Sequence, residues 1–162
     1  MRYWILATGV ALTLAAAIGC GSKSSAPATS GLNRKIDDES AAAAKKIEGS
    51  YTVVEMLVGG KQDKRSGETK SFLIKDGKIA IERGGAKRVM MFSVDSSSQP
   101  GHIDMTYPND NKTTKGIYEI KENENEVEVR LAFPEDVDDN VRPKDFRGTE
   151  GVLIKLTRKK TG

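Results

Sequence analysis

His102 is the only histidine in the 162-residue chain, so it is the first candidate for acid–base or nucleophilic chemistry. A Ser-His-Asp or Cys-His arrangement needs an imidazole within hydrogen-bond reach of a nucleophile. The nearest serines, Ser93 and Ser96–Ser98, show no nucleophile-elbow pattern, and His102 falls on the polar side of an alternating segment. The sequence therefore predicts a surface histidine rather than a catalytic base, and a protein that is not an enzyme.

Carboxylates are the second group that could do chemistry. An acidic run holds Glu135, Asp136, Asp138 and Asp139, whose oxygens could bind Ca²⁺. Their spacing does not fit an EF-hand loop, which needs ligands at alternating positions, a central glycine and a closing glutamate. We therefore expect a solvated acidic loop and no metal site.

A pair of facing carboxylates is the one route to catalysis that stays open, because two of them are enough for glycoside hydrolysis. The strand residues considered for such a pair are Glu55, Glu82, Asp104 and Glu128. Alternation places Asp104 and Glu128 opposite the apolar residues of their strands, so we expect both on an outer face.

Cofactor sites based on thiols or phosphate loops are not expected. Cys20 is the only cysteine, which excludes disulfides and cysteine-based metal sites from the rest of the chain. Gly59-Gly60 and Gly84-Gly85 do not open a helix after a strand, as a phosphate-binding loop must, and they predict hairpin turns. The net charge of +3 comes without a basic stripe, so nucleic acid is not an expected partner.

The residues before Cys20 have the layout of a secretion signal. Arg2 precedes the apolar run Trp4–Ile18, which is shorter than the about 20 residues needed to cross a bilayer. Ala17-Ile18-Gly19-Cys20 resembles the lipobox of bacterial lipoproteins, although leucine is more usual where Ala17 stands. A spanning anchor and ordinary cleavage after Ala15-Ala16-Ala17 are the alternatives to this interpretation.

The lipobox resemblance implies a signal peptide over residues 1–19, cleavage before Cys20, and lipidation of that cysteine. The protein would then attach to a membrane of the cell envelope through its N-terminal lipid. Gly21 stands where an aspartate tends to retain lipoproteins in the inner membrane, so we expect the periplasmic side of the outer membrane. Residues 20–36 are rich in Ser, Gly, Ala, Pro and Thr and predict a flexible tether.

A single domain is expected over residues 37–162. Asp37–Glu48 predicts a short helix, because acidic residues open it, alanines fill it and Gly49 follows it. From Ser50 the pattern changes to period two, with turn residues between the segments. The expected strands are Tyr51–Leu57, Ser71–Lys75, Lys78–Glu82, Arg88–Val94, His102–Tyr107, Gly116–Ile120, Glu126–Ala132 and Val152–Thr157.

Such a series of strands joined by short connections indicates an all-β sandwich or a closed antiparallel barrel. Asp76-Gly77 between two of the strands is a strong signal for a type I′ hairpin. The one long connection, Phe133–Gly151, is a functional loop or a cover for one end of the barrel. Within it, Arg142 next to Pro143, together with Phe146, is expected to anchor the loop on the barrel.

Five stretches in the same order resemble a lipocalin-like domain family that is common in planctomycete bacteria. They are Ile47–Val54, Ile103–Thr106, Gly116–Tyr118, Arg142-Pro143 with Phe146, and Val152–Leu156. The resemblance implies an eight-stranded lipocalin-like barrel and no particular ligand. Tyr51 stands where the family usually has tryptophan, and the cysteine that relatives often carry near Leu131–Ala132 is absent. Arg158 is the expected stacking partner of Tyr51.

Two functions follow as hypotheses. The first is a lipid-anchored binding module that holds a small apolar or amphipathic ligand, or an envelope protein. The second is a structural or interaction lipoprotein whose barrel is filled by side chains, since eight strands leave room only for side chains or one small ligand. The residues expected to fill it are Val53, Ile74, Ile81, Met91, Ile103, Met105, Val129 and Ile154. A void of a few hundred cubic ångströms would favour the first hypothesis.

Overall fold

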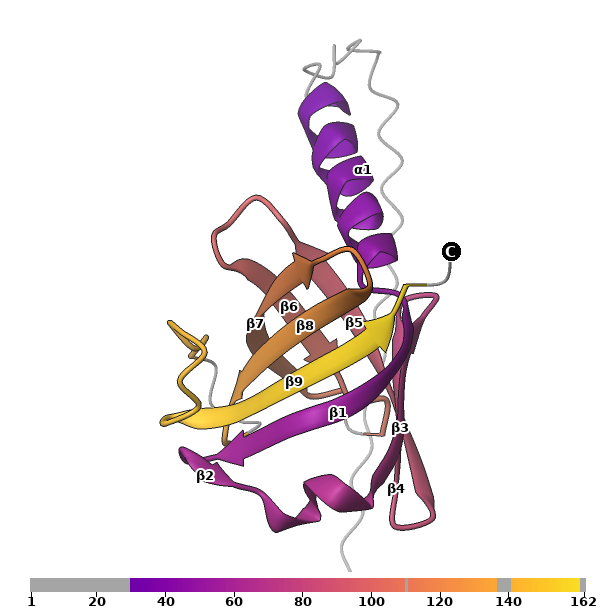
Figure 1. The fold of residues 1–162 in the computed structure, drawn as a ribbon. Helices are drawn as coiled ribbons and strands as arrows, with labels where there is room; N and C mark the ends of the chain where they lie inside the picture. Colours follow the sequence, from indigo (N-terminus) through magenta and orange to yellow (C-terminus); the bar gives the residue numbers. More distant parts are fainter. Residues whose placement is uncertain (1–29, 110, 137–140, 161–162) are drawn as a thin grey trace, which may run out of the picture.

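The computed structural model describes residues 30–109, 111–136 and 141–160, which form one helix followed by an antiparallel barrel (Figure 1). The predicted signal peptide, Cys20 and the first part of the predicted tether lie outside these residues. The elements are α1 (Ser30–Lys46), β1 (Gly49–Val58), β2 (Lys61–Gln62), the 3-10 helix η1 (Lys64–Glu68), β3 (Thr69–Lys75), β4 (Lys78–Arg83), β5 (Ala86–Asp95), β6 (Gly101–Thr106), β7 (Thr113–Glu122), β8 (Glu126–Pro134) and β9 (Gly151–Lys159).

Eight of the strands close into a barrel, which confirms the predicted fold class. From β3 to β9 each strand pairs antiparallel with the next along the chain, and β1 pairs with both β3 and β9 to close the sheet. Every predicted strand overlaps one of these eight. The extra strand, β2, pairs only with the end of β1, and its two residues are too short to show a period-two pattern.

The β3–β4 hairpin has the predicted turn. Asp76 and Gly77 have φ angles of 50° and 69°, the left-handed values that a type I′ turn requires at both central positions. Lys75 and Lys78 face each other directly beside this turn. The turn therefore fixes the register that points Phe72 and Ile74 of β3 into the barrel.

Helix α1 covers one end of the barrel, which we call the helix end (Figure 1). The helix begins at Ser30, well before the predicted Asp37, and ends at Lys46 rather than Glu48, so the predicted tether was too long. No proline interrupts the sequence between Ser30 and Lys46, and the run of alanines favours helix over coil. Ala43 and the following Ile47 are buried in the barrel core.

The interior is built by alternation along each strand. Phe72, Ile79, Ile103, Leu131 and Leu156 are each 1 % exposed or less and come from different strands. The prediction that Met91 faces the interior is wrong, because Met91 is 56 % exposed while its neighbour Met90 is buried. The pattern of β5 is ambiguous in sequence because apolar residues stand at consecutive positions, and pairing with β4 and β6 decides which ones face inward.

The predicted contact between Tyr51 and Arg158 is present at the helix end. The Arg158 guanidinium carbon lies 5.6 Å from the centroid of the Tyr51 ring, and Nε donates to the Tyr51 hydroxyl over 3.2 Å. The same hydroxyl donates to the Ile47 carbonyl over 2.9 Å. Gly49 makes room for the arginine, because a Cβ at this position would lie 2.6 Å from Arg158 Cδ. Tyr51 thus joins the last strand to the end of α1.

The burial of Tyr51 gives a prediction at high pH. Burial raises the pKa of Tyr51 above the value of about 10 that it has in an unfolded chain, despite the nearby Arg158. The unfolded state therefore loses this proton first, and the stability contributed below pH 10 is lost as the pH rises further. We expect Tyr51→Phe to flatten the fall in unfolding free energy between pH 9 and about pH 11, measured by urea denaturation. Equal slopes for both proteins would contradict this role.

Candidate functional site

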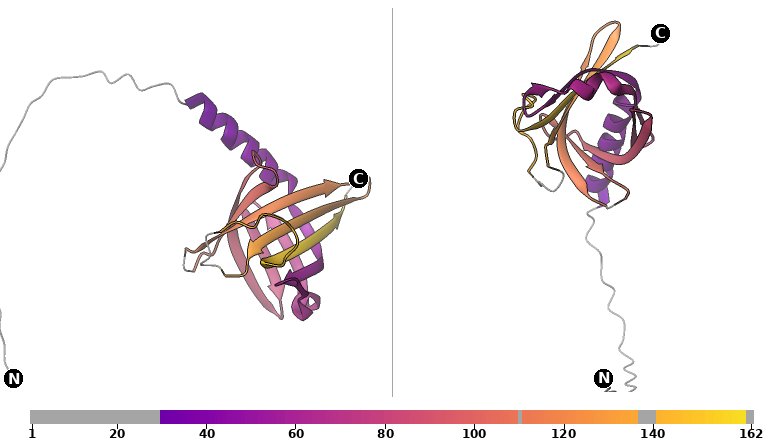
Figure 2. Two further views of the ribbon diagram at one scale, coloured as in Figure 1. Left: turned by 90° about the vertical axis from the view of Figure 1, so that its left-hand side faces the viewer. Right: turned by 90° about the horizontal axis from the view of Figure 1, so that it is seen from below.

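The barrel holds a cavity of about 520 Å³ at the end opposite α1, which we call the open end. Its apolar wall comes from the ends of β1, β4, β6 and β8 and from the beginnings of β5, β7 and β9. Figure 2 (right) views the barrel from this side. The apolar residues that line it include Met56, Ile81, Met90, Met105, Phe133 and Ile154. The hollow is therefore part of the barrel interior and is continuous with the core.

The inward residues of β7 are small at this end of the barrel. Gly116 has no side chain to place inside, and the Phe133 ring lies over it so closely that a Cβ would be 2.5 Å from two ring atoms. Thr114 is the next inward residue towards the open end. By contrast, the helix end is filled by Ile47, Tyr51 and the large side chains beside them. The interior thus has a packed half and a hollow half.

Thr114 is the unusual polar residue of the cavity. It is 2 % exposed and lines the cavity, and its hydroxyl has no hydrogen-bond partner within the described chain. A buried hydroxyl without a partner costs about 1–3 kcal/mol, so such groups are rare in folded proteins. The hydroxyl is thus a polar group that the barrel buries beside its cavity without a bonding partner among the described residues.

Thr114→Val is expected to leave the ligand-free protein as stable as before or to stabilise it by about 1 kcal/mol, because it removes an unsatisfied hydroxyl. The matched control is Thr106→Val on the outer face. The Thr106 hydroxyl shares a 2.9 Å hydrogen bond with that of Thr113, and its loss is expected to cost up to about 1 kcal/mol. Urea denaturation of both variants measures the difference. A clear loss of stability in Thr114→Val would show that its hydroxyl is already bonded in the free protein.

Charged residues surround the rim of the open end. Arg83, Arg88, Glu68 and Glu135 all border the cavity. Arg83 lies 4.0 Å from an Asp63 carboxylate oxygen and 3.9 Å from one of Glu68. Arg88 forms no ion pair or hydrogen bond with any residue that the structure describes. With respect to the described residues, Arg83 is therefore paired and Arg88 is not.

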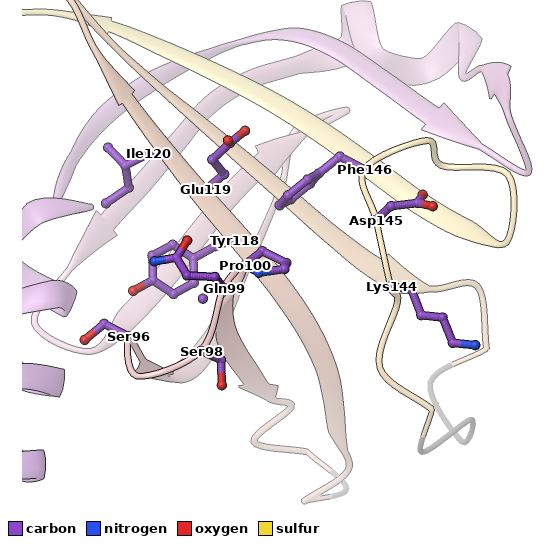
Figure 3. A pocket seen from close by; sticks show the side chains of 11 residues that line it. Ser96, Ser98, Gln99, Pro100, Tyr118, Glu119, Ile120, Lys144, Asp145 and Phe146 are labelled. Carbon is purple, nitrogen blue, oxygen red and sulfur yellow. The ribbon is translucent and has the colours of Figure 1, made fainter.

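A second hollow, of about 540 Å³, is a groove on the outside of the barrel (Figure 3). It lies between the β5–β6 turn, with Ser96, Ser98 and Gln99, and the long loop, with Asp145 and Phe146. Asp145 accepts hydrogen bonds from the Arg147 backbone and side chain at 2.9 and 2.7 Å, which hold its pKa below the usual value. Since it is open and polar, this groove is a weaker candidate for an apolar ligand than the barrel cavity.

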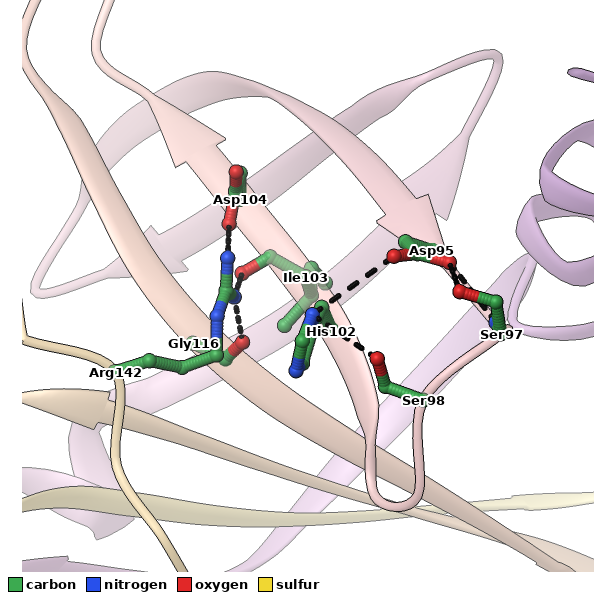
Figure 4. Close-up of polar contacts among 8 residues, drawn as sticks. All are labelled: Asp95, Ser97, Ser98, His102, Ile103, Asp104, Gly116 and Arg142. Atoms are coloured by element: carbon green, nitrogen blue, oxygen red, sulfur yellow. Dashed lines mark hydrogen bonds and ion pairs between the residues drawn. The ribbon is translucent and has the colours of Figure 1, made fainter. Parts of the chain in front are cut away.

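The long loop is anchored on the outer wall of the barrel, as predicted for Arg142 and Phe146, rather than over one of its ends. Arg142 Nη2 donates to Asp104 Oδ1 over 2.7 Å, and Nη1 donates to the carbonyls of Ile103 and Gly116 (Figure 4). Phe146 packs against a small outer cluster of Ile117, Ala132, Leu153 and Leu57. The part of the long loop that the structure describes after residue 140 therefore lies against the wall.

His102 lies on the outer face with Ser98 and Asp95 beside it (Figure 4). Both contacts reach the same ring nitrogen, Nδ1, at 3.4 Å from Ser98 Oγ and 3.8 Å from Asp95 Oδ2. A triad uses the two ring nitrogens for its two partners, so these contacts do not form a proton relay. Asp95 is held mainly by Ser97, whose hydrogen bonds keep the pKa of the carboxyl below its usual value.

The strand carboxylates face away from the cavity. Asp104 binds Arg142 on the outer wall, and Glu128 lies 2.8 Å from Arg130 and 3.1 Å from Lys155. Glu55 is opposite Lys155 and Glu82 is opposite Ser71 on the same outer side. Of the acidic loop, Glu135 and Asp136 are exposed, and Asp138 and Asp139 lie outside the described residues.

Within the described ranges, no three His, Cys, Asp or Glu side chains are grouped so that they could bind a metal ion. In the same ranges, no helix has the length and apolar character to span a bilayer. Sequence reasoning missed two features of the cavity, Thr114 and Arg88. Thr114 lies two residues before the predicted strand Gly116–Ile120, and extending the alternation of that strand would have found it. Arg88 begins a predicted strand, but the wrong inward assignment of Met91 placed it on the outer face.

Comparisons with protein-family models, with curated proteins and with solved structures found no match to this chain. The resemblance to the lipocalin-like family of planctomycetes therefore stays a prediction from the sequence. The candidate site is defined by its own geometry, which is an apolar cavity in the open end of a barrel with a charged rim.

Proposed function

We propose that this protein is a binding module that holds a small apolar or amphipathic molecule in the open end of its barrel. The observation that carries the proposal is the cavity of about 520 Å³. Its volume falls in the range of about 300–1,000 Å³ that is usual for ligand sites, and its wall is mainly apolar. The charged residues of the rim support the same proposal, because ligand sites combine apolar walls with a few placed polar groups.

The alternative is a structural or protein-interaction lipoprotein with a filled barrel. The packed helix end, with Ile47, Ile74 and Leu156 fully buried, fits that alternative for half of the interior. The open end does not, since the side chains that meet there leave a void. The binding module is therefore the function that the geometry supports better.

Native mass spectrometry of the protein from its own cells tests the proposal. The expected result is a second species whose added mass corresponds to one small molecule, which dissociates on collisional heating before the chain unfolds. The control is Val152→Trp, which places a large ring at the cavity wall and should lose the added mass. A single apo species from protein purified without detergent would argue for the filled-barrel alternative.

The proposed location is the cell envelope, with the N-terminal lipid on Cys20 holding the barrel at a membrane. The support is the order of charged residue, apolar run and Ala17-Ile18-Gly19-Cys20 in the sequence. The outer membrane is the proposed site, because Gly21 does not provide the aspartate associated with inner-membrane retention. Cys20→Ala is expected to abolish labelling by a radioactive fatty acid, and unchanged labelling would exclude lipidation at this residue.

A further inference from the structure

We propose that the ligand is an amphipathic anion, whose carboxylate or phosphate head binds Arg88 while its apolar chain enters the cavity. This inference rests on the proposed function and specifies the class of ligand. It is carried by the position of Arg88, by its lack of a partner, and by the chemistry of the wall behind it.

Arg88 lies on the inward-facing side of β5, at the rim. It is opposite Ile81 of β4, which lines the cavity, and two residues before Met90, which is 3 % exposed. The residues on either side of Arg88, Lys87 and Val89, belong to the outer side of the same strand. Arg88 is itself exposed, so its guanidinium marks the boundary between the apolar interior and water. A ligand with its head there can stay hydrated while its chain is buried.

The two arginines of the rim differ in their partners. Arg83 has Asp63 and Glu68 within 4.0 Å. Arg88 is exposed and has no anionic partner among the described side chains. A guanidinium binds carboxylate and phosphate groups through two parallel hydrogen bonds, and this makes the unpaired arginine the natural contact for such a head.

The wall behind Arg88 suits a flexible chain. Met56, Met90 and Met105 are buried and line the cavity from three different strands. Methionine side chains are unbranched and polarizable, so they adapt to chains of different length and bend. Because the guanidinium and the three thioethers border one cavity, a single molecule of about a dozen carbons can contact both.

Methionine-methyl NMR of the full processed chain in phosphatidylcholine nanodiscs provides the test. Met90 and Met105 report on the cavity, and the exposed Met91 is an internal control on the outer face. The probes are dodecanoate, dodecyl phosphate, dodecanol and dodecylammonium, each titrated into wild type, Arg88→Gln and the matched outer-face variant Lys87→Gln. Each variant is compared with wild type for the same probe in the same nanodiscs. The partition of the probe into lipid is then equal on both sides of the comparison.

The expected result is a loss of about tenfold in the affinity of both anions in Arg88→Gln, which corresponds to one charge-assisted contact. The affinity of Arg88→Gln for dodecanol should change less than about twofold, and Lys87→Gln should change the affinity for no probe by more than that.

Equal losses of affinity for anion and alcohol, or no loss for either anion, would overturn the inference and leave the proposed function standing. Preferred binding of dodecylammonium would also overturn it and would point to Glu135. If no probe shifts Met90 or Met105, the proposed function itself fails.

Discussion

Leu131→Ala is expected to lower the free energy of unfolding by about 2–5 kcal/mol, the usual cost of truncating a buried leucine. Leu131 is 0 % exposed in the middle of β8, between Tyr118 of β7 and Ile154 of β9 in the register of the sheet. Its removal opens a void where the packed and hollow halves of the interior meet. Urea denaturation of the full chain measures the change in the free energy of unfolding.

The matched control is Leu73→Ala, the same truncation on the outer face of β3. Leu73 is 39 % exposed and lies beside Ala80 of β4, so its loss should cost less than about 1 kcal/mol. The difference between the two leucines tests the inward and outward assignment directly. Similar losses at both sites would contradict the register on which the cavity depends.

Arg142→Ala is expected to release the long loop from the barrel wall. The Arg142 guanidinium donates hydrogen bonds to Asp104 and to two backbone carbonyls, and the Arg142 side chain is 21 % exposed. Hydrogen bonds to a charged group contribute about 1.5–3 kcal/mol, and the partial exposure reduces this towards the lower value. We expect a loss of about 1–2 kcal/mol and about tenfold faster hydrogen exchange in residues 141–150.

Arg147→Ala is the control within the same loop. Its side chain is 79 % exposed, and Asp145 is its only ion-pair partner among the residues that the structure describes. An exposed pair of this kind is worth little, so stability and hydrogen exchange should stay close to wild type. If the two arginines behave alike, Arg142 is not the anchor of the loop.

The strand order could be predicted because local signals agree with one another. Ile103 and Met105 alternate with Asp104, Val127 and Val129 alternate with Glu128, and Asp76-Gly77 sets a hairpin between two such segments. Local patterns of this kind need no knowledge of the partner strand. The sequence-based prediction missed the two-residue strand β2 and the beginning of α1, because the sequence carries no clear local pattern at either place.

The cavity could not be predicted from the same patterns, because it depends on which side chains meet across the barrel. Phe133 fits over Gly116 only when β7 and β8 have the observed register, and that register brings Phe133 and Thr114 to the same cavity. Similarly, only pairing with β4 decides that Met90 lines the cavity and Met91 does not. By contrast, one contact between distant residues was predicted. Arg158 was expected to stack on Tyr51, and the structure contains this contact.

The most direct test of the central claim is whether an apolar molecule binds inside the open end of the barrel. Dodecanol is titrated into wild type and two variants. Val152→Trp places a large ring in the cavity, and Val89→Trp makes the same change on the outer face. We expect saturable methyl shifts of Met90 and Met105 in wild type and Val89→Trp, and none in Val152→Trp. Shifts confined to Met91, or equal binding by Val152→Trp, would contradict a ligand site in the barrel.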